Sequence, residues 1–272
     1  MNETIDLGDV PLISESRTLF IPLLGKAEVS RRGIILDDEK AEEITGALGL
    51  DSQDGSMSKW LAYFLSMRAR VFDEWLEAQL RTCPTALVVQ IGCGLDSRCV
   101  RVEEKYGKWV DCDLSEVVEM RRLFYEETDA YALLPLDATN PGGLAGLPSS
   151  DKAVVALEGL SMYLDRDELF QLLSAIRSRY ESIHVLMDAY TELGAKLSRI
   201  KNPVKSVGVE TVFGFDDIEA IAVKAGYRGI REKQMTPSRL IDELSLPERL
   251  VFSALYAGSF AKGIYRLYEF EA

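Results

Sequence analysis

A glycine turn and the acidic residue that follows it have the residue types and the spacing to hold a ligand. Gln90-Ile-Gly-Cys-Gly-Leu-Asp-Ser-Arg98 closes an apolar run that begins at Ala86, and Asp113 ends the next apolar run, 19 residues after Gly94. In α/β proteins such glycines let a ligand approach the backbone, and a carboxylate at the tip of the next strand accepts hydrogen bonds from ribose hydroxyls. The pattern therefore predicts an enzyme with a nucleoside-bearing cofactor.

The residues inside the turn favour one cofactor over another. A dinucleotide site has a third glycine and a pyrophosphate at a helix N-terminus, but here Ser97 takes the third position and Asp96 lies within the turn. The Asp96 carboxylate would repel a pyrophosphate. S-adenosylmethionine carries no phosphate, and its ammonium group is compatible with a nearby acid. The pattern favours S-adenosylmethionine over NAD, which stays the alternative.

Strands and helices alternate around this turn. We expect apolar strands at 86–91, 108–112, 132–136, 153–157 and 183–187. Four of them end next to an acidic residue: Asp113, Asp137, Glu158 and Asp188. Alternating strands and helices favour a parallel sheet, in which a ligand lies outside the carboxyl ends of the strands. We therefore expect the four carboxylates on one rim.

The remaining segments predict a cap and a second set of strands. Residues 1–58 are read as a helical N-terminal cap, and 59–272 as the cofactor-binding domain, which opens with a long helix at 59–80. Further helices are expected at 116–127, 166–180 with Asp165 as N-cap, 216–225 and, mostly, 239–257. Strands at 228–233 and 263–270 are expected to pair as a hairpin.

Composition excludes several classes of protein. The 272 residues are 47% hydrophobic and 28% charged, as in a soluble globular protein, and the net charge of -13 argues against a nucleic-acid partner. Four cysteines without a CxxC pair, and a single histidine, argue against a zinc site and a disulfide framework. No signal peptide or membrane-spanning run is evident, so we expect a cytoplasmic protein without a metal or a membrane partner.

Four motifs together resemble the leucine carboxyl methyltransferase family, including its branch similar to tetracenomycin polyketide O-methyltransferases. They lie at 89–98, 113–121, 136–137 and 158–164, with a further match at 68–75, and the resemblance covers about residues 18–190. It implies a class I methyltransferase fold, Rossmann-like, with a mostly parallel seven-stranded sheet, helices on both faces and a helical N-terminal cap. It also implies S-adenosylmethionine as methyl donor and S-adenosylhomocysteine as product.

The resemblance implies a role for several residues at the methionine end of the cofactor. Arg70 and Lys26 match the basic residues that hold the cofactor carboxylate. Gly92 and Gly94 would shape the loop against the methionine portion, and Glu158 would lie beside that portion and the mouth for the acceptor.

The nucleoside end is matched by residues of the second and third motifs. Asp113, followed by Leu114, would take the ribose diol. Asp137 would accept from the adenine amino group, and the Ala138 N–H would meet a ring nitrogen. Ser115 stands where the family has proline, a change that does not affect the ribose contact.

Methyl transfer from a sulfonium is an in-line displacement, so most of the catalysis can come from orientation. A carboxylate acceptor needs no general base, whereas a hydroxyl would benefit from one. Glu158 and Tyr163 are the catalytic candidates, with Asp188 and Tyr190 also expected on the rim. His184 is expected at the start of a strand, away from that rim, and Cys93 is given no chemical role.

The acceptor predicted from these features is a small-molecule carboxylate or hydroxyl, such as a polyketide-like metabolite. The alternatives are a protein C-terminus, NAD-dependent oxidoreduction, or cofactor binding without catalysis. The cap and residues 192–212 are expected to cover the acceptor. Basic residues there would steer an anionic acceptor, or would simply form a solvated face: Lys196, Arg199, Lys201 and Lys205.

Overall fold

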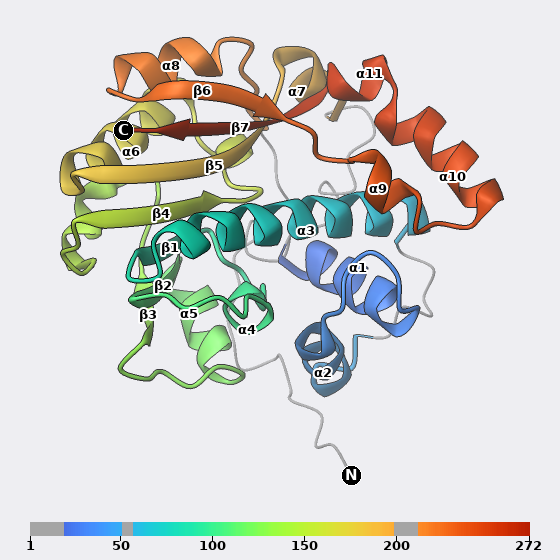
Figure 1. The fold of residues 1–272 in the computed structure, drawn as a ribbon, viewed down its shortest axis with the longest axis horizontal. Helices are drawn as coiled ribbons and strands as arrows, with labels where there is room; N and C mark the ends of the chain where they lie inside the picture. Colours follow the sequence, from blue (N-terminus) through green and yellow to red (C-terminus); the bar gives the residue numbers. More distant parts are fainter. Residues whose placement is uncertain (1–18, 51–56, 199–211) are drawn as a thin grey trace.

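A seven-stranded sheet forms the centre of the computed structural model, which describes residues 19–50, 57–198 and 212–272 (Figure 1). The strand order is β3-β2-β1-β4-β5-β7-β6. The first five strands of this order are parallel, whereas β7 runs antiparallel to β5 and β6. The bounds are β1 Leu87–Ile91, β2 Lys108–Asp113, β3 Tyr131–Pro135, β4 Lys152–Leu157, β5 Ser182–Tyr190, β6 Arg228–Lys233 and β7 Tyr265–Glu271.

Helices cover both faces of the sheet, which confirms the predicted fold. All five residues of β1 are buried, because alternate side chains enter two different cores. Val88 belongs to a core that includes residues of helices α1 Phe20–Arg31, α2 Glu39–Ala47, α3 Lys59–Thr82 and α10 Leu246–Phe252. Val89 belongs to the other core, which includes residues of α6 Arg166–Arg179 and α8 Ile218–Lys224. None of the helices in the described ranges is both long and apolar enough to cross a lipid bilayer.

The main helices begin and end near the predicted residues. Helix α3 begins at Lys59 as expected, and α6 begins after Asp165, whose side chain accepts hydrogen bonds from the N–H groups of Asp167 and Glu168. Helix α5, Ser115–Arg122, is shorter than the predicted 116–127. The short elements are α4 Arg98–Arg101, η4 Pro141–Gly146, η5 Ser161–Tyr163 and α7 Glu192–Ser198.

Strand β5 is longer than predicted, and this changes the place of Asp188. The strand was expected to end at residue 187, but it continues to Tyr190 because β7 pairs with it from His184 to Tyr190, with Asp188 opposite Leu267. Asp188 is therefore inside the sheet and 0% exposed. Its predicted position on the open rim is wrong.

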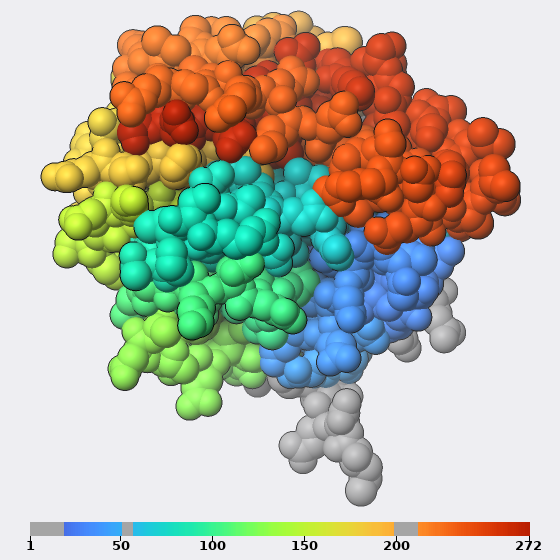
Figure 2. Space-filling model, in the orientation of Figure 1, coloured from blue at the N-terminus to red at the C-terminus, as the bar shows by residue number. Residues whose placement is uncertain are grey.

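A helical segment joins β6 to β7 and lies beside the N-terminal helices. It comprises α9 Ser238–Ile241, α10, η7 Ser253–Ala257 and α11 Ser259–Lys262. The late strands are antiparallel, as predicted, but this long segment takes the place of a hairpin turn. Phe252 packs on Tyr63 of α3, and Glu248 pairs with Arg32 next to α1. Figure 2 shows this orange-red surface against the blue surface of α1. Residues 1–18 and 51–56 of the predicted cap lie outside the described residues, and its boundary at residue 58 stays a prediction.

Candidate functional site

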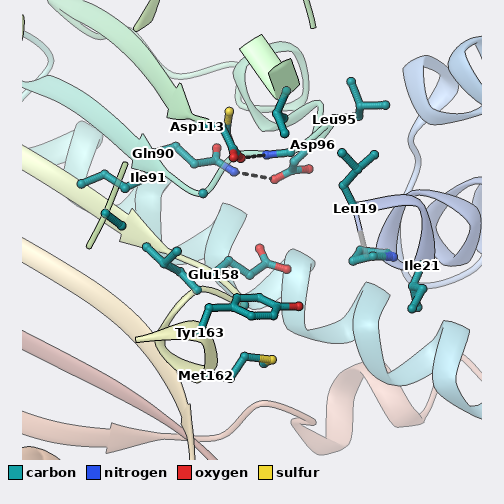
Figure 3. A pocket seen from close by; sticks show the side chains of 18 of the residues that line it. Leu19, Ile21, Gln90, Ile91, Leu95, Asp96, Asp113, Glu158, Met162 and Tyr163 are labelled. Atoms are coloured by element: carbon teal, nitrogen blue, oxygen red, sulfur yellow. Dashed lines mark hydrogen bonds between the residues drawn. The ribbon is translucent and has the colours of Figure 1, made fainter. Parts of the chain in front are cut away.

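A cavity of about 540 Å³ lies at the carboxyl-terminal edge of β1, β2 and β4, between that edge and helices α1 and α3. Its volume is in the range of small-molecule and cofactor sites. Figure 3 shows Asp113, Gln90 and Asp96 on one side and Met162 and Tyr163 on the other. The cavity therefore combines a polar wall with an apolar and aromatic one.

The turn after β1 brings backbone close to the cavity. Gly92 and Gly94 have φ values of +73° and +52°, the left-handed region that side chains disfavour. A Cβ atom on Gly92 would lie 3.2 Å from the Leu160 side chain, and the Gly92 N–H donates to the Cys112 carbonyl at 2.8 Å. A side chain at Gly92 is therefore disfavoured by both backbone conformation and space.

Asp113 ends β2 and points its carboxylate into the cavity. Its Oδ2 accepts from the Gly94 N–H at 2.7 Å, and its Oδ1 accepts from the Leu114 N–H at 2.8 Å. Burial raises the pKa of Asp113 to about 6, although these two hydrogen bonds and Arg121 act in the opposite direction. Each oxygen retains a second lone pair, which can accept from a ligand hydroxyl.

Lys26 and Asp96 form an ion pair in the polar wall. The Lys26 Nζ lies 2.6 Å from Asp96 Oδ1, and Gln90 donates to Asp96 Oδ2 at 3.0 Å. Burial by itself would raise the pKa of Asp96, but Arg101, Arg98 and Lys26 together hold it well below the ordinary value. Lys26 therefore lines the cavity, with Asp96 as an anionic neighbour, and its contact with the cofactor carboxylate stays a prediction.

Arg68, rather than the predicted Arg70, is the arginine of α3 that lines the cavity. Arg68 donates through Nε to Glu158 at 3.0 Å and through Nη1 to Asp188 at 2.9 Å. The Arg70 side chain is 42% exposed and pairs with Glu74. Side chains two positions apart on an α-helix point in directions about 200° apart, so only one of Arg68 and Arg70 can face the cavity.

The helical spacing of the residues in α3 could have identified Arg68 as the arginine that faces the cavity. Leu61, Phe64 and Leu65 also line the cavity, and Arg68 follows them at the i+7, i+4 and i+3 positions of the same helix face. Arg70 lies off this face. The structure therefore contradicts the expected place of Arg70 beside the cofactor, because the motif that indicated Arg70 carries no information on which face of α3 meets the cavity.

Asp137 and Ala138 follow β3 and line the cavity beside Asp113. Asp137 Oδ1 accepts from both the N–H and the hydroxyl of Thr139, at 2.9 and 2.8 Å. The carboxylate thus closes a local turn through one oxygen. Its Oδ2 accepts none of these hydrogen bonds.

Glu158 and Tyr163 both line the cavity. The Glu158 carboxylate is held by Arg68 through one oxygen and by Arg98 through the other. Tyr163 ends η5, next to Met162 on the apolar wall. Tyr190 is on this wall too, stacked on Tyr265 at 4.3 Å, and burial raises the pKa of Tyr190 to about 12.

The other residues singled out from the sequence lie elsewhere or play no part. His184 is near the start of β5 and does not line the cavity; its Nδ1 is 3.7 Å from the Glu271 carboxylate. Cys93 is in the glycine turn, where burial raises the pKa of its thiol and disfavours a reactive thiolate. Of the basic cluster, Lys196 pairs with Glu192 at 3.7 Å, whereas Arg199, Lys201 and Lys205 lie outside the described residues.

Comparison with known proteins places the chain in a family. The family model for leucine carboxyl methyltransferase matches residues 20–177, more than half of the chain. A tetracenomycin polyketide synthesis O-methyltransferase of Streptomyces glaucescens is 28% identical over 216 residues, which is 79% of this chain and 78% of that protein. An S-adenosyl-L-methionine-dependent methyltransferase of Gibberella zeae is 26% identical over 237 residues, 79% of this chain and 80% of that protein.

A solved structure supports the same fold. The S-adenosylmethionine-dependent methyltransferase from Mesorhizobium loti superimposes with a TM-score of 0.51 at 13% identity, covering 74% of this chain and 98% of that chain. The family and its cofactor leave the NAD alternative without support. The chain belongs to the leucine carboxyl methyltransferase family and is an S-adenosylmethionine-dependent methyltransferase of the class I fold.

Proposed function

We propose that this enzyme methylates an oxygen atom of a small and largely apolar acceptor, either a carboxylate or a hydroxyl. The observation that carries the proposal is the apolar and aromatic wall, which lines the same cavity as the polar wall. The apolar wall comprises Leu61, Phe64, Met162, Tyr163 and Tyr190. Such a wall fits a polyketide-like ring system better than a polar peptide backbone. The similarity to the Streptomyces glaucescens enzyme supports the same choice.

The described residues fit both ends of S-adenosylmethionine. At the nucleoside end, we assign the ribose hydroxyls to Asp113 beside Leu114, and adenine to Asp137 Oδ2 and the Ala138 N–H. At the methionine end, the glycine turn leaves room for the ligand against the backbone at Gly92 and Gly94. Lys26 and Arg68 are the two cations that line the described cavity, and we assign them to the methionine carboxylate.

The residues around the methyl group act by orientation. When bound, S-adenosylmethionine would supply the methyl group from its sulfonium, and its sulfur would leave as the neutral thioether of S-adenosylhomocysteine. The apolar wall excludes water and holds the acceptor oxygen in line with the methyl group. Because two arginines hold Glu158, we assign Glu158 to fixing the cofactor end, and we assign Tyr163 to orienting the acceptor oxygen.

Cofactor affinity should depend on pH through Asp113. The ribose hydroxyls donate to the ionised carboxylate, so binding favours the deprotonated form. With a pKa of about 6 before binding, protonation competes with the cofactor as the pH falls below 6. We expect S-adenosylhomocysteine to bind about tenfold more weakly at pH 5 than at pH 8, measured by calorimetry. An equal affinity at the two pH values would show that Asp113 does not receive the ribose.

The acceptor class can be tested with methyl-labelled S-adenosylmethionine. We expect label transfer to aromatic, polyketide-like acids or phenols, and none to a peptide that ends in a free leucine carboxylate. Mild alkali then distinguishes the products, because it releases label from a methyl ester and leaves an aryl methyl ether intact. Asp113→Asn serves as the background control. Transfer to the peptide alone would contradict a small-molecule acceptor and favour methylation of a protein C-terminus.

A further inference from the structure

Asp188 is a buried carboxylate that joins three walls of the cavity without lining it. Its Oδ1 accepts from the Gly159 N–H at 2.7 Å, in the loop after β4. Its Oδ2 accepts from Arg68 Nη1 of α3 at 2.9 Å and from the Tyr265 hydroxyl of β7 at 2.6 Å. The Asp188 carbonyl also accepts from the Ser161 hydroxyl at 2.6 Å. One residue of β5 therefore connects a helix, a loop and a neighbouring strand.

These contacts fix the guanidinium group of Arg68 in one orientation. Nη1 is taken by Asp188 and by the Tyr265 hydroxyl, at 2.9 Å each, and Nε is taken by Glu158 at 3.0 Å. Nη2 donates to none of the described residues. An arginine presents its donors in a rigid plane, so holding Nε and Nη1 also sets the direction of Nη2.

The same carboxylate fixes the loop at 158–163. Gly159 has a φ of +68°, and its N–H is held by Asp188 Oδ1. Glu158 precedes this glycine and Tyr163 ends the loop, so the loop connects the methionine end of the cavity to the apolar wall. A shift of the Asp188 side chain would therefore move both Glu158 and Tyr163.

Burying this carboxylate is costly. Asp188 is 0% exposed, and burial raises its pKa although Arg68 and the Tyr265 hydroxyl oppose that effect. Well-packed apolar residues often stabilise a fold as well as a buried ion pair does. The burial of Asp188 with Arg68 is therefore weak evidence for a role in stability.

We propose that Asp188 is a positioning residue for methyl transfer, which aims Arg68 Nη2 at the carboxylate of the cofactor and holds the loop at 158–163 against the methionine end. The inference rests on the assignment of Arg68 to the cofactor carboxylate. It does not depend on the identity of the acceptor.

The substitution Asp188→Asn tests this role, because it keeps the shape but cannot satisfy the contacts. All three partners, at Gly159, Arg68 and Tyr265, are donors toward Asp188. An amide has one acceptor oxygen, and its NH₂ group would face a donor on one of the two sides. Arg68 or the loop must then move, which should weaken binding of the methionine end alone.

The experiment compares two ligands that share the nucleoside and differ in the amino acid end. Calorimetry gives Kd for S-adenosylhomocysteine and for 5′-methylthioadenosine, which lacks the ammonium and the carboxylate. We expect Asp188→Asn to weaken S-adenosylhomocysteine by about tenfold and to leave 5′-methylthioadenosine within about twofold of wild type. Equal weakening of both ligands, or a loss of thermal stability with no change in either, would overturn the proposal.

Glu269 offers a matched control, because it too is a carboxylate that joins α3 and β7. Glu269 of β7 also bridges to α3, where it accepts from Trp75 Nε1 at 2.9 Å, and it pairs with Lys233 at 3.0 Å. It does not line the cavity. Glu269→Gln should lower the melting temperature and leave the affinity ratio of the two ligands unchanged. A change of that ratio equal to the change in Asp188→Asn would show a general structural effect and contradict the proposal.

A milder variant covers the case in which Asp188→Asn does not fold. Tyr265→Phe removes the hydroxyl that contacts both Asp188 and Arg68. It should shift the affinity ratio in the same direction by a few-fold, and an unchanged ratio would overturn the proposal. If wild type bound neither ligand, the assignment of the cofactor site would fail, which is a different outcome from failure at Asp188.

Discussion

The substitution Arg68→Lys is expected to weaken S-adenosylhomocysteine binding by about ten- to hundredfold, or roughly 1.5–3 kcal/mol. Arg68 serves Glu158 and Asp188 at once through separate nitrogens. A lysine keeps the charge, but its three donors share one nitrogen, which cannot lie beside both of these carboxylates and the cofactor carboxylate as the arginine fork can. The donor that Arg68 Nη2 directs at the cofactor would therefore be lost from that position. Removing the charge altogether would leave two buried carboxylates without their partner, so lysine is the cleaner change.

Arg70→Lys provides the matched control for this prediction. It makes the same change two residues along the same helix, at a side chain that pairs with Glu74 and does not line the cavity. We expect its affinity for S-adenosylhomocysteine to stay within about twofold of wild type, because exposed ion pairs contribute little. Comparable losses in the two variants would show that Arg68 has no special place in the site.

Asp113→Asn is expected to weaken the cofactor by more than about a hundredfold, or roughly 3 kcal/mol for two charge-assisted hydrogen bonds to ribose. The carboxylate accepts from the Gly94 and Leu114 N–H groups and has acceptor capacity left for both hydroxyls. An asparagine has one acceptor oxygen, and its NH₂ group would face a backbone donor. Kd for S-adenosylhomocysteine measures the effect.

The same two ligands separate the effect of Asp113 from that of Arg68. Since ribose is common to S-adenosylhomocysteine and 5′-methylthioadenosine, Asp113→Asn should weaken both by a similar factor. Arg68→Lys should weaken only the ligand that carries the carboxylate. If Asp113→Asn affected S-adenosylhomocysteine alone, the nucleoside would not be at Asp113.

Local spacing was enough to predict that residues at the ends of β1, β2 and β3 line one cavity. The glycine turn, Asp113 and Asp137 each follow a buried apolar strand, and parallel strands bring their carboxyl ends to the same edge. Because this arrangement follows from the order of strands along the chain, no tertiary detail was needed. The sequence pattern placed these residues around one cavity correctly.

The places of Arg68 and Asp188 depend on contacts that are distant in sequence. The choice between Arg68 and Arg70 depends on which face of α3 meets the sheet. The burial of Asp188 depends on β7, which pairs with β5 from the end of the chain. The position of α10 beside α1 likewise joins segments about two hundred residues apart, as in the pair of Arg32 with Glu248. Periodicity within a single segment does not contain such information.

A crystal structure with bound S-adenosylhomocysteine would test the assigned site most directly. We expect the Asp113 carboxylate within hydrogen-bond distance of both ribose hydroxyls, and Arg68 Nη2 within that distance of the ligand carboxylate. The sulfur should face the apolar wall that contains Tyr163. A ligand carboxylate bound at Arg70, or a ribose away from Asp113, would contradict the assignment.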